Sequence, residues 1–382
     1  MDTQTLLDAL RRGEDSRQQF KVDVTNVDAL AAELVAFANA AGGRLIIGVD
    51  DRGDVRGLTR DDIARLNQLV SNAASQAVRP PINPLTDNVA TDQGLVMVVT
   101  VAPGLNRPYM DGKGRIWVKS GADKRQVTAR EEMQRMFQDA GLVQAEAVPV
   151  PGAAIADLDL LLLRDYLERR YGLPLDTEDL PRLLENLDLA RNGVPNLAGL
   201  LLFGRRPQRF KPAFMIKAVA FAGTGIHETA YRDSEDIEGA MPNLYKTAHG
   251  FVLRQLRRLQ RGQGVNSPGL LEVPAIVFEE LLVNALIHRD YFISAPIRLL
   301  VFDDRIEIIS PGHLPNHLTT AQVRYGVSNM RNPVLASHGA YLLPYRGIGS
   351  GILRAYAAYP DIELIDDRDG RQFKAVVARP EG

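Results

Sequence analysis

The chain has 382 residues, of which 45% are hydrophobic and 24% charged, and its net charge is −2. This composition is ordinary for a globular protein, and the length allows two or three domains with their own cores. The absence of cysteine excludes disulfides, thiolate zinc sites and cysteine nucleophiles, and it fits a reducing compartment. No apolar run is long enough to span a membrane, and residues 1–21 lack the apolar stretch of a secretion signal, so we expect a cytoplasmic protein.

The N-terminal part alternates helix and strand signals. Leu30, Leu34 and Phe37 recur at helical spacing before the pair Gly42-Gly43, which ends the pattern, and a short apolar run typical of a buried strand follows. The predicted elements are helices over residues 28–41 and 60–77 and strands over residues 44–49, 95–102 and 116–118. This order predicts an α/β domain over residues 1–142.

Residues 143–156 are small, contain proline and are almost uncharged, which is typical of a linker. The elements predicted after it are helices over residues 159–171, 179–187, 240–261 and 278–291, a strand hairpin of 198–203 with 214–221, a second hairpin of 297–302 with 305–310, and a last strand over 373–378. The sequence therefore predicts a second α/β (α+β) domain over residues 157–382, which begins with a helical segment.

The predicted helix over residues 278–291 brings a carboxylate and an amide together. Glu280 and Asn284 are four residues apart and therefore share one face. An amide oxygen is a suitable neutral ligand for magnesium, and a carboxylate one turn away can activate the water that attacks a γ-phosphate. A solvated surface pair is the alternative interpretation of this spacing.

A glycine-rich stretch later in the chain favours the chemical interpretation. Gly347, Gly349 and Gly351 alternate at the start of a predicted helix, where free backbone N–H groups and the helix dipole both favour an anion. Together with Glu280 and Asn284, this order of motifs predicts a site for magnesium and phosphate.

The segments EELLVNALIHRDY, IRLLVFDDRIEIISPGHLP, RNPVLA and GIGSGILR resemble the GHKL-like ATPase domain of bacterial regulators often labelled RecG-like, over about residues 180–380. The resemblance implies an α/β sandwich that binds ATP and Mg²⁺, with Glu280 as general base, Asn284 as metal ligand and a flexible lid between Gly312 and Gly347. The nucleotide-site residues that it implies are Asn284, His288, Arg289, Asp290, Gly312, Arg331, Asn332, Gly347, Gly349, Ser350 and Gly351.

Two features depart from this family pattern. Ser310-Pro311-Gly312 stands where a typical GHKL site has an aspartate that reads the adenine amino group, and Glu279 stands where relatives usually have an arginine. The sequence therefore predicts magnesium and phosphate binding more directly than adenine specificity or ATP hydrolysis. The chain also contains no GxxxxGK[ST] motif, so a helicase motor is excluded.

The stretch ELVAFANAAGGRLIIGVDDRGDVRGL, with the polar residues that precede Phe20, resembles the Schlafen-type AlbA-like domain over about residues 10–140. The resemblance implies nucleic-acid binding and, in some members, RNA cleavage by three carboxylates that hold a divalent metal. The corresponding positions are Glu14, Gln19, and Asp50 or Asp51. Because the amide of Gln19 cannot supply the negative charge that holds a catalytic metal, we do not expect nuclease activity from this remnant.

Residues 107–135 contain eight Lys or Arg against four Asp or Glu, which is a local charge of +4. Alternation along the predicted strand places Arg115, Trp117 and Lys119 on one face. The predicted nucleic-acid contacts are Arg115, Trp117, Lys119, Lys124 and Arg125, with the cations on phosphates and the ring stacked on a base. A solvated basic face is the alternative.

The sequence therefore predicts an ATP-responsive, nucleic-acid-binding regulator or defence-associated factor with weak ATPase activity, which contacts the backbone of DNA or RNA. We expect a homo-oligomer, a dimer or higher. Two alternatives stay open: a metal-dependent nuclease of Schlafen type, and a catalytically inactive oligomeric scaffold.

Overall fold

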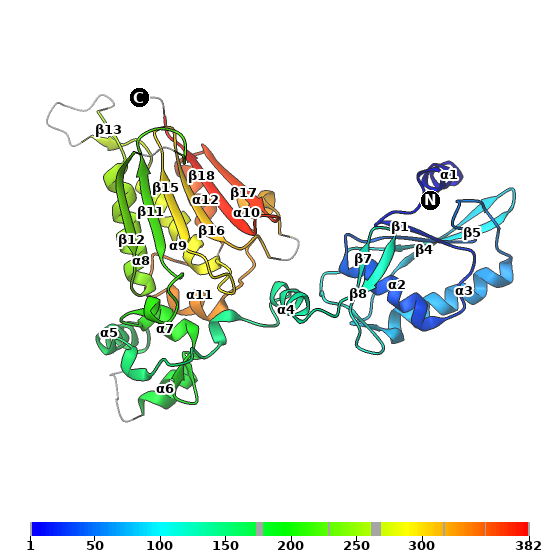
Figure 1. Ribbon diagram of the computed structural model, residues 1–382, viewed down its shortest axis with the longest axis horizontal. Coiled ribbons are helices and arrows are strands. Elements are labelled where there is room, and N and C mark those ends of the chain that lie inside the picture. The colour runs from blue at the N-terminus through cyan, green and yellow to red at the C-terminus, as the bar shows by residue number, and fades with distance from the viewer. Residues whose placement is uncertain are drawn as a thin grey trace. The chain divides into compact units, whose positions relative to one another are not determined.

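The structure, a computed structural model, describes residues 2–172, 179–227, 230–260, 269–315, 318–347 and 349–380. The chain divides into two compact units, Met1–Val143 (unit 1) and Gln144–Gly382 (unit 2), and each unit is built from helices and sheets (Figure 1). The predicted α/β fold class is therefore confirmed. Within the described ranges, no helix combines the length and the apolar character that crossing a membrane requires.

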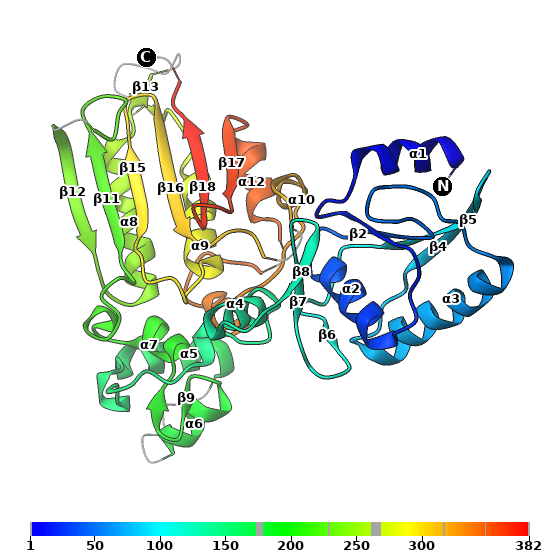
Figure 2. The ribbon, with the colours of Figure 1, turned by 45° about the vertical axis from the view of Figure 1, so that its right-hand side comes forward.

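Unit 1 is built on a four-stranded sheet with helices on both faces. The strands, in spatial order, are β1 (Gln18–Lys21), β2 (Gly43–Ile47), β5 (Gly94–Val101) and β4 (Leu85–Thr91). In this sheet β1 and β2 run parallel and the other neighbours antiparallel. Because side chains alternate between the faces of a strand, β2 and β5 bury one set against α2 (Val27–Asn39) and α3 (Arg60–Asn72) and the other set against α1 (Thr3–Arg12) (Figure 2).

The remaining elements of unit 1 are short. They are β3 (Val78–Arg79), β6 (Met110–Asp111), β7 (Trp117–Ser120), β8 (Asp123–Gln126), α4 (Arg130–Asp139) and a π-helical turn over Ala73–Ala77. Neither α1 nor β4 is predicted from the sequence. Most of β4 is exposed, so its sequence carries no alternating apolar signal.

The AFANAAGG stretch joins α2 to β2 and organises the residues around it. The side-chain amide of Asn39 donates to the carbonyl oxygens of Tyr109 and Trp117, and its oxygen accepts from the N–H of Tyr109. A Cβ at Gly43 would lie 2.4 Å from the Phe37 ring, so only glycine allows this close packing. The motif therefore acts as a structural joint of unit 1.

Unit 2 is built on a six-stranded sheet. Its strands, in spatial order, are β12 (Tyr231–Ile237), β11 (Ile216–Phe221), β15 (Ile297–Val301), β16 (Arg305–Pro311), β18 (Gln372–Ala378) and β17 (Ile362–Asp367). In this sheet β11 and β15 are parallel and the other neighbours antiparallel. The helices α8 (Met241–Gln255), α9 (Ala275–His288) and α12 (Gly351–Ala358) cover one face, and α9 is apolar on nearly all sides because it packs against the other two as well as the sheet.

The other elements of unit 2 surround this core. They are α5 (Leu160–Tyr171), α6 (Leu180–Asn186), α7 (Leu197–Phe203), α10 (Thr320–Arg324), α11 (Pro333–Gly339), the strand pairs β9 (Ala190–Arg191) with β10 (Val194–Pro195) and β13 (Arg258–Leu259) with β14 (Leu270–Leu271), and 3-10 turns over Ala145–Ala147, Ile155–Asp157 and Pro207–Arg209.

Three predicted elements of unit 2 differ from the structure. Residues 198–203, predicted as a strand, belong to α7, whose N-cap Asn196 accepts from the N–H of Gly199. All of α7 is buried, and a short, uniformly apolar run does not distinguish a buried helix from a strand. The helix predicted over 240–261 ends at Gln255 because the next residue is extended, and Arg261 lies outside the described residues. The helix predicted over 278–291 ends at His288.

Residues 144–156, within the predicted linker, pack into unit 2. Their small apolar side chains contribute to its core, and Glu146 is fully buried. The carboxylate of Glu146 accepts the backbone N–H groups of Val334, at 2.8 Å, and Leu335, at 2.7 Å, which begin α11. A stretch with the composition of a linker is therefore anchored in the second unit, because small side chains fit a close-packed core as well as a flexible segment.

This buried carboxyl makes the stability of unit 2 depend on pH. Burial raises the pKa of Glu146 from 4.5 to about 7, so the fold favours the protonated form. The stability from this proton is fully present below the unfolded pKa and is lost as the pH rises through about 7, a loss of at most about 3 kcal/mol at about 1.36 kcal/mol per pKa unit. We expect the calorimetric melting temperature of unit 2 to fall between about pH 5 and pH 8, and to fall less in Glu146→Gln. Equal falls in both proteins would contradict this.

Candidate functional site

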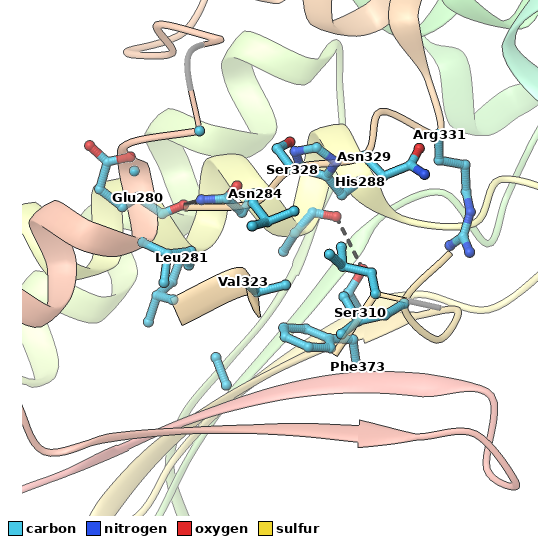
Figure 3. Close-up of a pocket in the computed structure, with 18 of the residues that line it drawn as sticks. Glu280, Leu281, Asn284, His288, Ser310, Val323, Ser328, Asn329, Arg331 and Phe373 are labelled. Carbon is cyan, nitrogen blue, oxygen red and sulfur yellow. Dashed lines mark hydrogen bonds between the residues drawn. The ribbon is translucent and has the colours of Figure 1, made fainter. Parts of the chain in front are cut away.

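One pocket of unit 2 gathers most of the residues predicted for the nucleotide. Its walls come from α9, the carboxyl end of β16, the segment 318–331 that contains α10, and the glycine-rich start of α12. The predicted residues that line it are Glu280, Asn284, His288, Gly312, Arg331, Gly347, Gly349, Ser350 and Gly351. Figure 3 shows Glu280 and Arg331 at opposite ends, with the apolar side chains of Leu281, Val323 and Phe373 along the part between them.

The carboxylate of Glu280 is buried and ion-paired. The residue is 4% exposed, and its Oε1 lies 2.5 Å from Nη2 of Arg354 on α12. Burial raises the pKa of this carboxyl, and the charge of Arg354 opposes that rise. Glu280 is therefore no solvated surface residue. Arg354 is not among the residues predicted from the sequence, although it lies one helical turn after Gly351, and that spacing places it near the glycine-rich start.

The amide of Asn284 is oriented by its own helix. Its Nδ2 donates to the backbone carbonyl oxygen of Glu280 at 2.6 Å, as Figure 3 shows. Because the nitrogen is held there, the amide oxygen is directed elsewhere, and Asn284 lines the pocket. The side chain thus offers a neutral oxygen of the kind that Mg²⁺ accepts as a ligand.

The start of α12 lies directly against this pair. A Cβ at Gly351 would lie 2.4 Å from Oε2 of Glu280 and 3.3 Å from Nδ2 of Asn284. Ser350, the N-cap, makes no side-chain capping hydrogen bond, so its side chain does not satisfy the first N–H groups of α12. The two glycines before it, at positions 347 and 349, have φ values of 70° and 72°, which favour glycine.

The close approach at Gly351 predicts an unusual response to alanine. We expect Gly351→Ala to destabilise unit 2 by about 1–3 kcal/mol, because the new methyl group overlaps the Glu280 carboxylate. Gly250→Ala on α8 is the matched control, since its Cβ would meet only Arg254 Nη1, at 3.8 Å. That change should stabilise by up to about 1 kcal/mol through helix propensity. Urea unfolding of the two variants measures the difference, and equal effects would show that the contact with Glu280 is relieved without cost.

The other end of the pocket is formed by His288, Gly312 and Arg331. Burial and the charge of Arg331 lower the pKa of His288 to about 4, so its imidazole is neutral at physiological pH. The Nη2 of Arg331 donates to the carbonyl oxygen of His313 at 2.8 Å. A Cβ at Gly312, whose φ is 102°, would lie 2.7 Å from the Nη1 of Arg331. This end therefore carries a positive charge that is held against the backbone.

Arg289, Asp290 and Asn332, predicted for the nucleotide, do not line the pocket. Arg289 is 2% exposed, and its guanidinium lies 4.7 Å from the ring centre of Phe214. Asp290 accepts from the backbone N–H two residues further on. Asn332 donates to the carbonyl oxygens of Ile287 and Arg289 and so caps the end of α9. Because α9 ends at His288, Arg289 and Asp290 no longer follow the helix face that lines the pocket. They lie in the turn after α9, and Asn332 binds the carbonyl oxygens there.

The basic residues predicted for nucleic acid in unit 1 are engaged within the unit. The carboxylate Oδ2 of Asp111 lies 2.7 Å from Nη2 of Arg115 and 2.9 Å from Nε1 of Trp117. The other ion pairs are Lys124 with Glu33 and Arg125 with Glu132. Asp111 and Glu132 belong to residues 107–135 and are already counted in the local charge of +4. Glu33, and Asp28 beside Lys113, come from outside the stretch and lower that charge to +2.

Lys119 lies partly buried in the same region. Its Nζ is 3.1 Å from Oε1 of Gln19 and 4.9 Å from the ring centre of Phe37. Burial lowers the pKa of this ammonium group, and the charge of Glu33 opposes the shift. Lys119 thus contacts Gln19 and Phe37. Gln19 is the position that corresponds to a family carboxylate, and its side-chain oxygen accepts a hydrogen bond from Lys119.

Two of the acids in unit 1 that correspond to the family carboxylates, Glu14 and Asp50, accept hydrogen bonds from backbone N–H groups. Glu14 accepts from the N–H of Phe20 at 2.7 Å. The carboxylate of Asp50 accepts from two backbone N–H groups of its own turn and pairs with Arg56 at 2.6 Å, while Asp51 is exposed in that turn. In the parts of the chain that the structure describes, no group of three His, Cys, Asp or Glu is placed to hold a metal ion. The local geometry favours structural roles for these acids.

The protein therefore consists of two α/β units. In the second unit, the glycine-rich start of α12 lies beside the buried carboxylate of Glu280. Residues 14–128 match the family model described as "Schlafen, AlbA_2". Residues 294–368 match the family model described as "Putative ATP-dependent DNA helicase recG C-terminal". The first match lies in unit 1 and the second in unit 2, and both predicted resemblances are confirmed.

Solved structures offer two further comparisons. The DIP2311 protein from Corynebacterium diphtheriae is 21% identical, with a TM-score of 0.46, over 99% of this chain and 69% of that one. The N-terminal domain of a RecG-related protein from Nitrosomonas europaea is 24% identical, with a TM-score of 0.25, over 34% of this chain and 96% of that one. No curated protein matches the chain.

Proposed function

We propose that unit 2 binds ATP with Mg²⁺ in the pocket between α9 and α12, and that unit 1 binds nucleic acid. The chain would then be a nucleotide-responsive regulator or defence-associated factor. The observation that carries the nucleotide part is the position of Glu280 and Asn284 against the uncapped start of α12. The two family matches support the coarser statement that the domains are related to nucleic acid and to ATP.

The residues of the pocket fit a magnesium nucleotide. The Asn284 oxygen would hold the metal, the N–H groups at the start of α12 would hold phosphate oxygens, and the apolar part would hold the base. Ser310 stands where the family has the adenine-reading aspartate, and its hydroxyl donates to the carbonyl oxygen of Ala285 at 3.1 Å. Its oxygen therefore keeps the capacity to accept from an amino group of the base.

Hydrolysis, which we propose to be weak, would depend on Glu280. Arg354 fixes the orientation of the carboxylate, and burial raises its pKa, so its basicity is greater than that of an exposed glutamate. Bound nucleotide supplies the phosphoryl group, and Glu280 takes the proton of the attacking water.

The segment 318–331 is the proposed lid. Gly326 packs on the glycine-rich segment, where a Cβ at Gly349 would lie 2.5 Å from the Gly326 carbonyl oxygen. Arg324 of α10 lies 4.4 Å from the ring centre of Tyr356 on α12. Phosphate held at the start of α12 would therefore change the contacts of the lid, which is the kind of ordering that nucleotide switches use.

A melting experiment tests the nucleotide proposal. ATP with Mg²⁺ should raise the melting temperature of unit 2 in the full chain, whereas Mg²⁺ alone or ATP with EDTA should raise it much less. GTP under the same conditions measures the specificity for the base. If no nucleotide shifts the transition, the inactive scaffold becomes the better account.

We do not propose the nuclease alternative, because Gln19 contacts Lys119 and Glu14 is bound to the backbone. The homo-oligomer and the cytoplasmic location stay predictions.

A further inference from the structure

A second depression lies at one end of the unit 1 sheet, where β1 and β2 begin and β5 ends. Three arginines line it, and they come from three segments: Arg12 ends α1, Arg17 precedes β1 and Arg44 lies in β2. None of the three is among the site residues predicted from the sequence.

The backbone holds these arginines in one place. The parallel register pairs Gln18 with Arg44, and the N–H of Arg44 donates to the carbonyl oxygen of Arg17 at 2.8 Å. The buried side chain of Gln18 donates to the carbonyl oxygens of Ala9 and Gly13, which fixes the end of α1 beside β1. The three side chains therefore start from a rigid part of the unit.

The arginines of this depression differ from the cations of the β7–β8 region, which form ion pairs with carboxylates of unit 1. In the described parts of the chain, the guanidinium groups of Arg12, Arg17 and Arg44 make no ion pair or hydrogen bond with protein groups. Asp15 also lines the depression, and its carboxylate accepts from the N–H of Arg17 at 2.6 Å. Three positive charges less one negative charge leave +2.

We propose that Arg12, Arg17 and Arg44 form a phosphate-binding site through which unit 1 holds the backbone of a nucleic acid. The inference rests on the nucleic-acid part of the proposed function, and it moves the contact surface away from Arg115, Lys124 and Arg125. Arginine presents a planar fork of donors that matches phosphate oxygens. A guanidinium without a protein partner breaks no existing ion pair when it binds a phosphate.

The test measures the binding of fluorescein-labelled single-stranded RNA to the full chain by anisotropy over a range of KCl concentrations. The triple variant Arg12→Gln, Arg17→Gln and Arg44→Gln should bind about 10- to 100-fold more weakly, and its slope of log affinity against log salt should be smaller by about 2. The same three positions changed to lysine should keep most of the slope. The control variant Arg52→Gln, Arg60→Gln and Arg130→Gln removes equal charge from exposed arginines of unit 1 and should change the affinity less than about twofold.

The outcomes separate the site from the function. If the wild type binds RNA, and the glutamine variant of the three site arginines binds it as well as the control variant does, the site is wrong while nucleic-acid binding stands. If the wild type binds neither RNA nor single-stranded DNA, the nucleic-acid part of the proposed function fails, and the site with it. Inorganic phosphate should compete no better than a chloride salt of equal ionic strength. Specific competition at low millimolar phosphate would assign the arginines to a free anion and overturn the nucleic-acid assignment.

Discussion

Replacing Asn284 by alanine is expected to abolish most of the stabilisation that ATP and Mg²⁺ give to unit 2. The amide oxygen is the proposed metal ligand, and losing a ligand should lower the affinity for the magnesium nucleotide by about 100-fold. At a nucleotide concentration of about 100 Kd, the wild type should gain about 2.7 kcal/mol and the variant only about 0.4 kcal/mol. Calorimetry with and without nucleotide measures both values.

Asn243→Ala is the matched control for this experiment. Asn243 lies on α8, outside the pocket, and its Nδ2 donates to the carbonyl oxygen of Glu238 at 2.7 Å, much as that of Asn284 donates to Glu280. Both variants lose a similar hydrogen bond, so a difference between them reports the ligand role alone. If the two variants respond to nucleotide alike, Asn284 is not a metal ligand.

Replacing Glu280 by glutamine is expected to remove ATP hydrolysis while nucleotide binding is retained. The amide is isosteric with the carboxylate, so it fits between Arg354 and Gly351, but it cannot accept a proton from water. Loss of a general base typically lowers the rate by about 10²–10⁴-fold. Phosphate release at saturating ATP measures the rate, and the melting shift measures binding in the same samples.

The pH dependence and a neighbouring variant complete this test. Because burial raises the pKa of Glu280, the wild-type rate should fall as the pH drops through a value above that of an exposed glutamate. Glu279→Gln, one residue earlier, changes a carboxylate that does not line the pocket and should hydrolyse ATP like the wild type. A Glu280→Gln protein that hydrolyses ATP at the wild-type rate would assign the base to another residue.

The sequence was sufficient to predict the pair on α9 and the glycine-rich start of α12. Spacing along one helix is a local property, and glycine with positive φ is a backbone requirement, so both can be inferred without the fold. The spacing from Gly351 places Arg354 near the glycine-rich start, but its ion pair with Glu280 could not be predicted, because the pair depends on how α9 packs against α12. For the same reason the sequence could not separate His288, which lines the pocket, from Arg289, which is buried beside Phe214.

The basic stretch of unit 1 shows the limit of counting charges. Eight cations against four acids within 107–135 indicated a surface for phosphate. The structure pairs Lys124 with Glu33, which is 91 residues earlier, and places the Arg115 guanidinium on the buried Asp111. A net charge over a window does not include partners that the fold brings from elsewhere. Arg12, Arg17 and Arg44 are the converse case, since their proximity depends on strand pairing.

Equilibrium dialysis of radiolabelled ATP against the full chain tests the central claim most directly. We predict saturable binding of about one nucleotide per chain in the presence of Mg²⁺, and a loss of about 100-fold in affinity when EDTA is added or when Asn284 is alanine. Binding that is absent with Mg²⁺, or that survives both EDTA and the Asn284→Ala change, would contradict a magnesium-nucleotide site between α9 and α12.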